Sequence, residues 1–442
     1  LAKRRSTILN YKIMNNHYKN HQLPDKVIRK LHELSYRVVL SIEQSVMLNK
    51  RPADKELSAW FRSRKELGSR DRRFLSQVVF SYFRWHGWTQ NDLRLSLDDS
   101  FLIADLLESE ALSQWAAYLS DKSVLPSIPK PMGTLTLNEK SQSLGECLKK
   151  PLAINDLLPA DYDKVLGQNE LKGYVNTFQY RPPTWMRIRS NAEELIKSLE
   201  NKNISALQHS HIANAVGIKG GINLNQKLSK SLGQFVIQDI ASQCVALVCM
   251  PLPGQLWWDC CAGSGGKSLH LADIMQQEGS IFASDIREES LSELKKRART
   301  CGIKTIRTQK YNLLDMKENN HRYDGVLVDA PCSGWGVWAR NPDARWRTSA
   351  KDVYQYAKKQ KLLLSKAAGA VKDGGVLVYA VCTITKQETT EVIDHFLENN
   401  PEFKYESFFN PMNNECCDGF LQIFPQNYDG MFIAKLRKTL TE

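Results

Sequence analysis

The stretch Gln255-Leu-Trp-Trp-Asp-Cys-Cys-Ala-Gly-Ser-Gly-Gly-Lys-Ser268 joins a short apolar segment to a loop of small residues. Gln255–Asp259 has the length and apolar character of a buried parallel strand. The glycines after it allow a sharp turn and a close approach to a ligand. The segment from Gly263 to Lys267 is too short for a Walker phosphate loop, G-x-x-x-x-G-K-[ST]. The stretch therefore predicts a strand, a ligand-binding turn and the start of a helix.

Strand and helix patterns alternate from this stretch to the C-terminus. Helical periodicity is clearest in residues 349–371, where apolar residues recur on one face. The further predicted strands are short apolar segments, at 280–285, 305–310, 325–329 and 375–381. This alternation predicts a doubly wound, Rossmann-like α/β domain whose ligands lie at the carboxyl ends of its parallel strands.

The N-terminal part of the chain has a helical pattern instead. Apolar residues recur at three- and four-residue spacing in Val27–Leu40 and in Phe74–Trp85. Ser69 is the predicted N-cap of a basic, aromatic helix. Its basic side could face RNA or only solvent, and the sequence favours neither. We predict a helical domain over residues 1–158.

A small α+β region is expected between these two parts, at residues 159–245. Its segment Trp185-Met-Arg-Ile-Arg189 alternates like a strand, and a helix is expected after Gln238 and Asp239. The α/β domain then occupies residues 246–442. The chain is thus predicted to have three parts, as its 442 residues suggest.

The composition favours a polyanionic partner and excludes several classes of protein. The formal net charge is +12 and the pI about 9.1, which suits binding to phosphates, although solubility alone could explain it. No apolar run approaches a membrane span, and the N-terminal Lys3, Arg4 and Arg5 do not resemble a secretory signal. The ten cysteines lack paired zinc spacing. We expect a cytoplasmic monomer without disulfides, bound metal or a membrane partner.

Polar residues follow the predicted strands where a nucleotide-like ligand would lie. Asp285 ends the second strand, about 20 residues after Gly265, which is the usual offset of a ribose-binding carboxylate. Asn312 follows the third strand, at the place of an adenine contact, and Asp329 ends the fourth. Nicotinamide dinucleotide and S-adenosylmethionine both fit this pattern, and Asp285 could instead be a plain helix cap.

Two cysteines are predicted to meet at this edge of the sheet. Asp329-Ala-Pro-Cys-Ser-Gly334 follows the fourth strand, and Tyr379-Ala-Val-Cys-Thr383 ends the fifth. A thiolate that adds to carbon 6 of cytosine makes carbon 5 nucleophilic enough to accept a methyl group. An acidic group, here Asp329, would support the charge near ring nitrogen 3. A thiol facing helix N-termini should be partly ionised, although either cysteine could also be a small buried core residue.

These motifs resemble the Nol/Nop/Sun family of RNA cytosine-5 methyltransferases. The similarity covers roughly Arg181 to the C-terminus and includes Cys261–Lys267, Gly336–Trp346 and Gly430–Lys435. The helical part resembles, more weakly, the NusB-like RNA-binding domain of the bacterial Sun branch, which modifies small-subunit ribosomal RNA. The resemblance implies that Cys382 is the nucleophile and that Cys332 assists release. It places the donor, S-adenosylmethionine, on Cys261, Ala262, Gly263, Ser264, Gly265, Gly266, Lys267, Asp285, Asn312 and Asp329.

Three positions depart from the family pattern, and other interpretations stay open. Ser264 replaces a common Pro, Val381 a Thr or Ser, and Asn312 a frequent Asp; we expect altered donor affinity without loss of activity. DNA cytosine methyltransferases would use the Pro-Cys cysteine, Cys332, but their Glu-Asn-Val motif is absent. A transfer RNA substrate, a non-catalytic ribosomal assembly factor and a nicotinamide oxidoreductase are the remaining alternatives.

Two basic clusters are candidate RNA contacts. The first lies between residues 287 and 310, and the second runs from Arg340 through Arg345 to Lys361. Trp335, Trp338 and Trp346 accompany the second cluster, which suits stacking on unpaired bases, although tryptophans in the core beside a solvated face fit equally. We expect Arg340, Arg345 and Lys267 to contact RNA. The target base would have to leave its stack to reach a buried thiolate.

Overall fold

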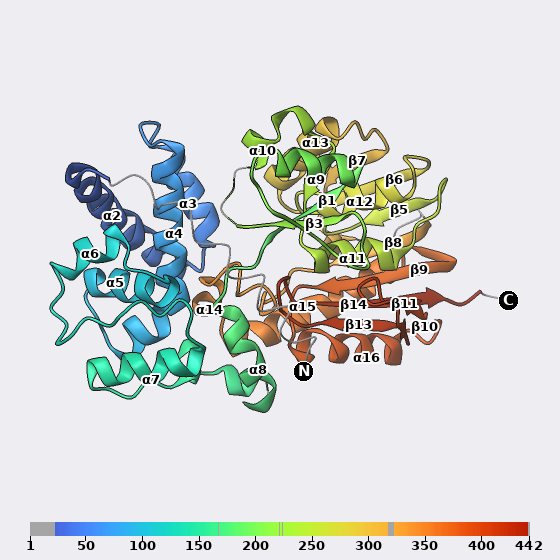
Figure 1. Ribbon diagram of the computed structural model, residues 1–442. Coiled ribbons are helices and arrows are strands. Elements are labelled where there is room, and N and C mark those ends of the chain that lie inside the picture. The colour runs from blue at the N-terminus through green and yellow to red at the C-terminus, as the bar shows by residue number, and fades with distance from the viewer. Residues whose placement is uncertain (1–22, 167, 221, 223, 317–321, 441–442) are drawn as a thin grey trace. The chain divides into compact units, whose positions relative to one another are not determined.

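The computed structural model describes residues 23–166, 168–220, 222, 224–316 and 322–440 (Figure 1). The chain divides into two compact units, Leu1–Tyr180 with Asn341–Ser349, and Arg181–Arg340 with Ala350–Glu442. The first unit thus extends past the predicted boundary at residue 158 and takes in a segment from the C-terminal half. Lys3, Arg4 and Arg5 lie outside the described residues.

The first unit is helical in its described part. The two predicted helices lie within α2 (Asp25–Asn49) and α4 (Ser69–His86). Their apolar faces meet in one core that includes Val38, Val79 and Phe83. The other helical elements are α3 (Ala53–Arg62), the π-helix η2 (Gly87–Asp92), α5 (Leu97–Glu108), α6 (Gln114–Ser120), α7 (Leu137–Leu148), the short turns η3 (Ile154–Leu157) and η4 (Tyr162–Lys164), and α8 (Gln168–Phe178).

Helix α4 begins one residue earlier than predicted. Gly68, not Ser69, is the N-cap, and its backbone N–H donates to the Asp71 carboxylate at 3.2 Å. The carboxylate in the first turn also interacts favourably with the helix dipole. Ser69 is therefore the first helical residue, and Asp71 rather than the predicted serine hydroxyl stabilises this end of the helix.

Residues 341–349 belong to the core of the first unit although they lie far along the chain. The Ala53 backbone N–H donates to Asp343 Oδ2 at 3.0 Å, and Trp346 Nε1 donates to the Phe83 carbonyl at 2.6 Å. The Trp346 ring also packs on His86, with ring centroids 5.1 Å apart. The segment includes the short helix α14 (Ala344–Arg347). These contacts make it an integral part of the helical core.

The second unit contains the α/β domain, built on one mixed sheet in the order β10-β14-β9-β8-β5-β6-β7, with β13 beside β14. The five predicted strands correspond to the parallel strands β5 (Leu256–Asp259), β6 (Ser280–Asp285), β7 (Ile306–Lys310), β8 (Tyr323–Asp329) and β9 (Val371–Val381). The Rossmann-like fold predicted from their alternation with helices is confirmed. Short turns η6 (Leu313–Asp315) and η7 (Lys386–Glu388) follow β7 and β9.

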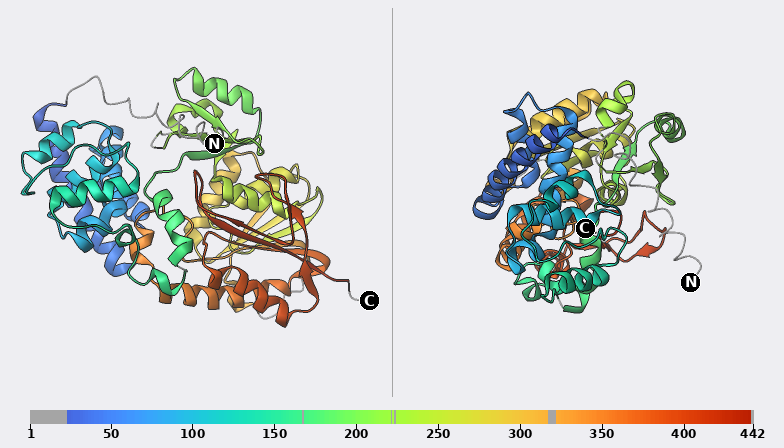
Figure 2. Two further views of the ribbon diagram at one scale, coloured as in Figure 1. Left: turned by 60° about the horizontal axis from the view of Figure 1, so that its bottom comes forward. Right: turned by 60° about the vertical axis from the view of Figure 1, so that its left-hand side comes forward.

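Helices cover both faces of this sheet, as Figures 1 and 2 show. Trp257 packs in the apolar cluster on the side of α11 (Ile240–Cys249) and α12 (Gly266–Ile274). The next residue, Trp258, packs in the opposite cluster, with α15 (Ala350–Ala368) and α16 (Thr390–Asn399). Successive strand residues point to opposite faces. Burial on both faces explains why β5 is apolar throughout. Helix α13 (Glu288–Thr300) connects β6 to β7.

The C-terminal part of the sheet differs from the sequence prediction. The helix predicted over 349–371 ends at Ala368, and Val371 already begins β9. Strand β14 (Met431–Lys438) then pairs antiparallel with β9, and it carries β10 (Phe403–Tyr405) and β13 (Phe420–Ile423) beside it. A two-stranded ribbon, β11 (Phe408–Phe409) with β12 (Cys416–Cys417), completes this region.

A small antiparallel sheet, in the order β2-β3-β1-β4, precedes the α/β domain. The predicted strand at 185–189 corresponds to β1 (Thr184–Ile188). Arg187 and Arg189 both form ion pairs with Asp273 of α12, which fixes the small sheet to the α/β domain. Its remaining elements are α9 (Ala192–Glu200), β2 (Ala206–Gln208), β3 (Ala215–Ile218), α10 (Leu224–Lys227), η5 (Ser229–Ser231) and β4 (Phe235–Ile237).

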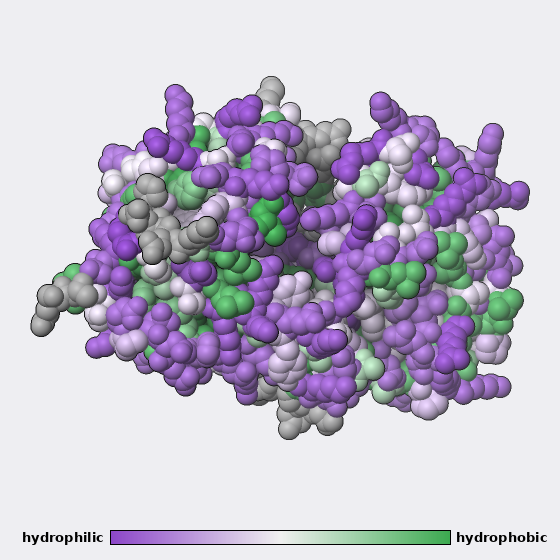
Figure 3. Space-filling view, turned by 180° about the vertical axis from the view of Figure 1, so that it is seen from behind, coloured by the Kyte–Doolittle hydropathy of each residue, from purple (hydrophilic) through white to green (hydrophobic). Residues whose placement is uncertain are grey.

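Figure 3 shows hydrophilic side chains over most of one face, interrupted by small apolar patches. Among the described helices, none has the length and apolar character needed to cross a membrane.

His86 provides a pH test of the first unit's core. The ring is buried between Tyr82, Phe83 and Trp346, and burial lowers its pKa to about 4. In the unfolded chain the His86 ring takes up a proton near pH 6.5, whereas in the folded protein it stays neutral down to about pH 4. The stability that neutral His86 contributes is therefore complete above pH 6.5 and falls as the pH drops towards 4. Between pH 7.5 and 5, wild type should lose about 2 kcal/mol more stability than His86→Phe. Denaturant unfolding at both pH values measures this, and equal losses would contradict it.

Candidate active site

The two predicted cysteines meet at the carboxyl edge of the sheet. Cys332 follows β8 and Cys382 follows β9, and their Sγ atoms lie 3.1 Å apart. The two strands are parallel neighbours in the register Asp329 opposite Ala380. Both side chains are partly exposed. All ten cysteines are free thiols, so this contact is not a disulfide.

The environments of the two thiols differ. The hydrogen bond with Cys382, burial and the charge of Glu388 together raise the pKa of Cys332 well above its ordinary value. Cys332 is therefore a thiol at neutral pH. This departs from the expectation that a thiol at this edge is partly ionised, because the negative groups beside Cys332 oppose its ionisation.

Lys267 and Asp329 form an ion pair beside the cysteines. Lys267 Nζ lies 2.6 Å from Asp329 Oδ2, and the lysine side chain is largely buried. Burial disfavours the Lys267 charge, but Asp329 and Cys382 outweigh it and raise the lysine pKa. The cation is thus retained near Cys382. The predicted RNA contact of Lys267 stays a prediction, and its described partner is a carboxylate.

The predicted donor loop has the backbone shape that its glycines suggested. Gly265 has φ +82° and caps α12, which begins at Gly266. A Cβ atom on Gly265 would lie 2.3 Å from Leu294 Cδ1. Gly263, with φ +54°, donates its backbone N–H to Asp285 Oδ2 at 2.8 Å. The loop therefore passes close to the end of β6, as a ligand turn must.

The remaining residues of the loop are held by local contacts. The Ala262 N–H donates to the Ser284 carbonyl at 2.9 Å. Ser264, which replaces the family's common Pro, accepts from Arg297 through its carbonyl at 2.8 Å and its hydroxyl at 3.1 Å. Cys261, which precedes Ala262, is partly exposed. Arg297 thereby restrains the loop at the position where proline would have restrained it.

Asp285 and Asn312 lie at the predicted strand ends but already have partners. Asp285 accepts from the Arg287 side chain at 3.0 Å with each carboxylate oxygen. Although burial opposes it, hydrogen bonding to Arg287 lowers the pKa of Asp285. Asn312 caps the turn η6, accepting from Leu314 and donating to Asp315 Oδ2 at 3.0 Å.

Asp259 is a site residue that the sequence reasoning did not select. It ends β5, is buried, and accepts from Ser268 Oγ at 2.6 Å through Oδ2. Its Oδ1 has no hydrogen-bond partner among the described residues. Burial raises its pKa to about 7. Its place at the end of the first strand, directly before the loop, was the signal that could have identified it.

The predicted RNA contacts are not supported by the positions of Arg340 and Arg345. Arg340 forms ion pairs with Asp239 at 2.9 Å and Asp429 at 3.3 Å. Arg345 is fully buried in the first unit, donating to the Leu157 carbonyl at 2.7 Å and the Phe178 carbonyl at 3.2 Å. The Arg340 side chain is about a third exposed, so its RNA contact stays a prediction, whereas burial of Arg345 contradicts a phosphate contact in this structure.

The accompanying tryptophans belong to the core. Trp335 and Trp338 are fully buried, with ring centroids 4.6 Å apart. Trp346 packs against His86 in the helical unit. The prediction of base stacking is therefore not supported for Trp335 and Trp338, and the alternative of tryptophans in the core holds for these two.

Comparison with known proteins identifies the family. A model described as 16S rRNA methyltransferase RsmB/F matches residues 246–437. A curated Synechocystis protein, "Probable ribosomal RNA small subunit methyltransferase B", is 30% identical over 318 residues, covering 69% of this chain and 70% of that protein.

Two solved structures share the fold. The structure of PH0851 has a TM-score of 0.70 at 23% identity, covering 95% of this chain and 100% of the other. That of NSun6 from Pyrococcus horikoshii with SFG has a TM-score of 0.57 at 18% identity, covering 64% and 99%. The donor used by this fold and family is S-adenosylmethionine. The sequence matches show that the chain belongs to the RsmB/F family of 16S rRNA methyltransferases.

Proposed function

We propose that the protein methylates carbon 5 of a cytosine in small-subunit ribosomal RNA, with Cys382 as covalent nucleophile and Cys332 as the residue that assists release. The observation that carries this proposal is the 3.1 Å contact of the two sulfur atoms beside the donor loop. A single nucleophilic cysteine would suffice for simple covalent catalysis. A second sulfur in contact with the first suits a reaction in which the covalent bond must also be broken.

The chain's own residues account for the steps at the base. Cys382 thiolate forms a bond from Sγ to carbon 6 of cytosine, and the ring electrons move towards carbon 5. Asp329 keeps its proposed place near ring nitrogen 3, and Lys267, paired with it, supplies positive charge where the ring becomes electron-rich. Bound S-adenosylmethionine supplies the methyl group that carbon 5 takes up. Loss of the carbon 5 proton to a base then restores the ring double bond and breaks the bond to Sγ.

Release is where Cys332 acts in this proposal. The departing Cys382 sulfur regains its negative charge as the bond to carbon 6 breaks. Cys332, whose raised pKa keeps it a thiol, is placed to donate a hydrogen bond to that sulfur. Hydrogen bonds to charged acceptors are roughly twice as strong as neutral ones. Cys332 thus lowers the free energy of the thiolate leaving group.

The residues at the strand ends suit S-adenosylmethionine. Asp259 Oδ1 is a buried acceptor without a partner among the described residues, which suits the amino group of the donor. Gly263 and Gly265 have the positive φ that the sharp turn needs, and a side chain at Gly265 would displace the loop from Leu294. Asp285 would accept hydrogen bonds from the ribose. Arg287, which donates to the same carboxylate, would then either keep its hydrogen bonds or move away. Asn312 keeps its proposed adenosine contact through an amide in place of the family's carboxylate.

The rRNA substrate is proposed from the family and its relatives, whose names specify ribosomal RNA. The helical unit is the proposed RNA-binding part, and its likeness to NusB stays a prediction. A transfer RNA substrate is the second candidate within the same chemistry.

The donor loop can be tested with a matched pair of glycine variants. Gly265→Ala places a Cβ atom against Leu294 and should weaken S-adenosylmethionine binding at least about tenfold, or about 1.4 kcal/mol. Gly254 has a similar φ, +84°, but nothing lies within 4 Å of its Cβ position. Gly254→Ala should therefore leave the Kd unchanged. Isothermal titration calorimetry measures both, and equal affinities for the two variants would contradict the assignment of the loop.

The cysteine roles predict opposite phenotypes. Cys382→Ala should lower methyl transfer by at least about a thousandfold and form no covalent adduct. Cys332→Ala should accumulate an RNA–protein adduct that survives denaturing electrophoresis, because addition proceeds while release stalls. Cys416→Ala, which removes an exposed thiol, is the control and should behave as wild type. An adduct with Cys382→Ala but not with Cys332→Ala would reverse the assignment.

The substrate is tested by transferring labelled methyl groups to total RNA from a strain that lacks this gene. We expect label at one cytosine of small-subunit ribosomal RNA, located by bisulfite sequencing. Label in transfer RNA would keep the chemistry and change the substrate. Absence of label in any RNA, with donor binding intact, would overturn the proposed function.

A further inference from the structure

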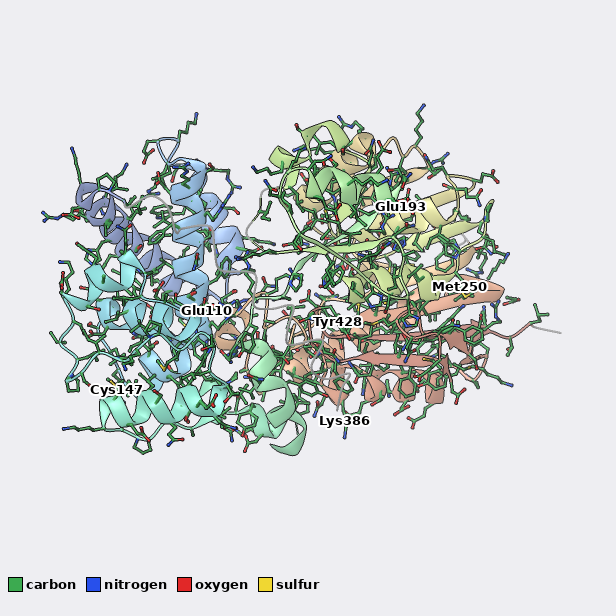
Figure 4. All side chains as sticks on the ribbon, viewed as in Figure 1. Glu110, Cys147, Glu193, Met250, Lys386 and Tyr428 are labelled. Atoms are coloured by element: carbon green, nitrogen blue, oxygen red, sulfur yellow. The ribbon has the colours of Figure 1, made fainter. Side chains whose placement is uncertain are left out.

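A buried carboxylate lies behind the two cysteines. Glu388 belongs to the turn η7, shortly after Cys382, and is fully buried. Lys386 of the same turn, labelled in Figure 4, is exposed. The donors to Glu388 are the Ser333 N–H at 2.9 Å, Gln360 Nε2 at 2.9 Å, Thr385 Oγ1 at 3.0 Å, Thr383 Oγ1 at 3.4 Å and the Ser333 hydroxyl. Burial raises the pKa of Glu388, and the hydrogen bonds from Ser333, Gln360 and Thr385 oppose that rise. Such a set of donors suits an ionised carboxylate, which only accepts.

These donors come from the two loops that carry the cysteines. Ser333 follows Cys332 directly, and Thr383 follows Cys382 directly. Glu388 binds both, and the two hydroxyl groups lie 3.1 Å from each other. Glu388 therefore ties the end of β8 to the end of β9 one residue beyond each sulfur, which restrains the distance between the sulfur atoms.

A backbone contact supports the same arrangement. The Gly336 N–H donates to the Cys382 carbonyl at 3.1 Å, and the Gly430 N–H donates to the Gly336 carbonyl at 2.7 Å. A Cβ atom on Gly336 would lie 2.4 Å from the Gly430 carbonyl oxygen. The loop after Cys332 is thus held at two points, at Ser333 by Glu388 and at Gly336 by the Cys382 backbone.

Distance alone does not decide which sulfur carries the negative charge. The charged and titratable groups around the pair come from four elements: Lys267 of α12, Asp329 of β8, Tyr379 of β9 and Glu388 of η7. Lys267 interacts with Cys382, whereas Glu388 interacts with Cys332. Gln360 of α15 is neutral and donates to Glu388. The surroundings are therefore electrostatically asymmetric.

We propose that Glu388 is a positioning residue that holds the Cys332 loop against the Cys382 strand end and, through its carboxylate, disfavours a negative charge at Cys332. An anion is thereby disfavoured at Cys332, and Cys382 is the proposed nucleophile, so the catalytic meaning of this inference rests on the proposed function. The direction agrees with the raised pKa of Cys332, to which the hydrogen bond with Cys382, burial, the charge of Cys382 and the charge of Glu388 contribute in that order. A carboxylate is costly to bury, and a purely apolar contact could not produce this asymmetry.

The test is the alkylation of each cysteine by a short pulse of iodoacetamide at pH 6 to 9, with labelled peptides counted by mass spectrometry. Only thiolates react at a useful rate. In wild type, Cys382 should be labelled before Cys332 at every pH. Glu388→Gln removes the charge with little change in shape, so the labelling of Cys332 should move to lower pH and its share at pH 7.5 should rise several-fold.

Glu388→Asp separates position from charge. It keeps the carboxylate but shortens the reach to Ser333, so it should slow methyl transfer while Cys332 labelling stays near its wild-type pH. Asp99→Asn is the matched control, since Asp99 is a buried carboxylate of the helical unit that accepts from Ser96 and Ser123. It should lower the melting temperature without changing the labelling ratio.

The outcomes distinguish this inference from the proposed function. An unchanged labelling ratio in folded Glu388→Gln would overturn the inference, and so would preferential labelling of Cys332 in wild type, which requires no variant to fold. Wild-type protein that labels as expected but methylates no RNA would overturn the proposed function and leave the role of Glu388 intact.

Discussion

Parallel pairing of β8 with β9 is the constraint on which the site depends. Asp329 lies opposite Ala380, so the residues that follow both strands emerge at one edge of the sheet. Neither strand could shift by one residue without turning its side chains to the wrong face. The two tryptophans of β5 are buried on opposite faces of the sheet, so both faces depend on the alternation of side chains along the strands. The sulfur contact is therefore a consequence of the register of a well-packed sheet.

The register brings the cysteines to the same edge, and polar contacts then set the finer distances. Backbone pairing ends at the strand termini, and beyond it the chain could take many paths. Glu388 and Gly336 fix one of these paths for the loop after Cys332. Lys267 and Asp329 do the same between α12 and β8. Each contact joins segments far apart in the sequence, so the site is ordered only when the whole α/β domain is folded.

Much of this arrangement follows from local sequence patterns. The five parallel strands and the meeting of Cys332 with Cys382 could be predicted, because strand periodicity and the topology of α/β sheets leave few alternatives. Glu388 could not, since nothing in its neighbourhood distinguishes a buried acceptor from a solvated glutamate. Arg345 was misjudged, and Trp335 was left undecided, for a related reason: alternation of basic and aromatic residues is equally typical of an RNA surface and of a packed core.

Residues 341–349 lie within the sequence of the α/β domain but pack in the helical unit. This explains part of the wrong prediction for Arg345. Sequence periodicity reports which side of an element is apolar, but not which domain that side joins. Asp343 and Trp346 have their hydrogen-bond partners in α3 and α4, nearly three hundred positions away in the case of Asp343.

Several of the positive charges counted towards the net +12 form ion pairs, among them Arg287 and Arg340. The exposed cations, such as Lys296 and Arg299 on α13, are the better candidates for phosphate contacts.

Assignment of the nucleophile ultimately depends on what breaks the symmetry of two touching thiols. The two cysteines have similar positions, since each follows a parallel strand and each is partly exposed. Their charged neighbours differ: the Lys267 cation interacts with Cys382, whereas the Glu388 carboxylate interacts with Cys332 and disfavours an anion there. Family resemblance leads to the same assignment by a separate route. Two sulfurs sharing one negative charge need such a bias, because addition to the base requires an anion at one defined atom and release requires a proton donor at the other.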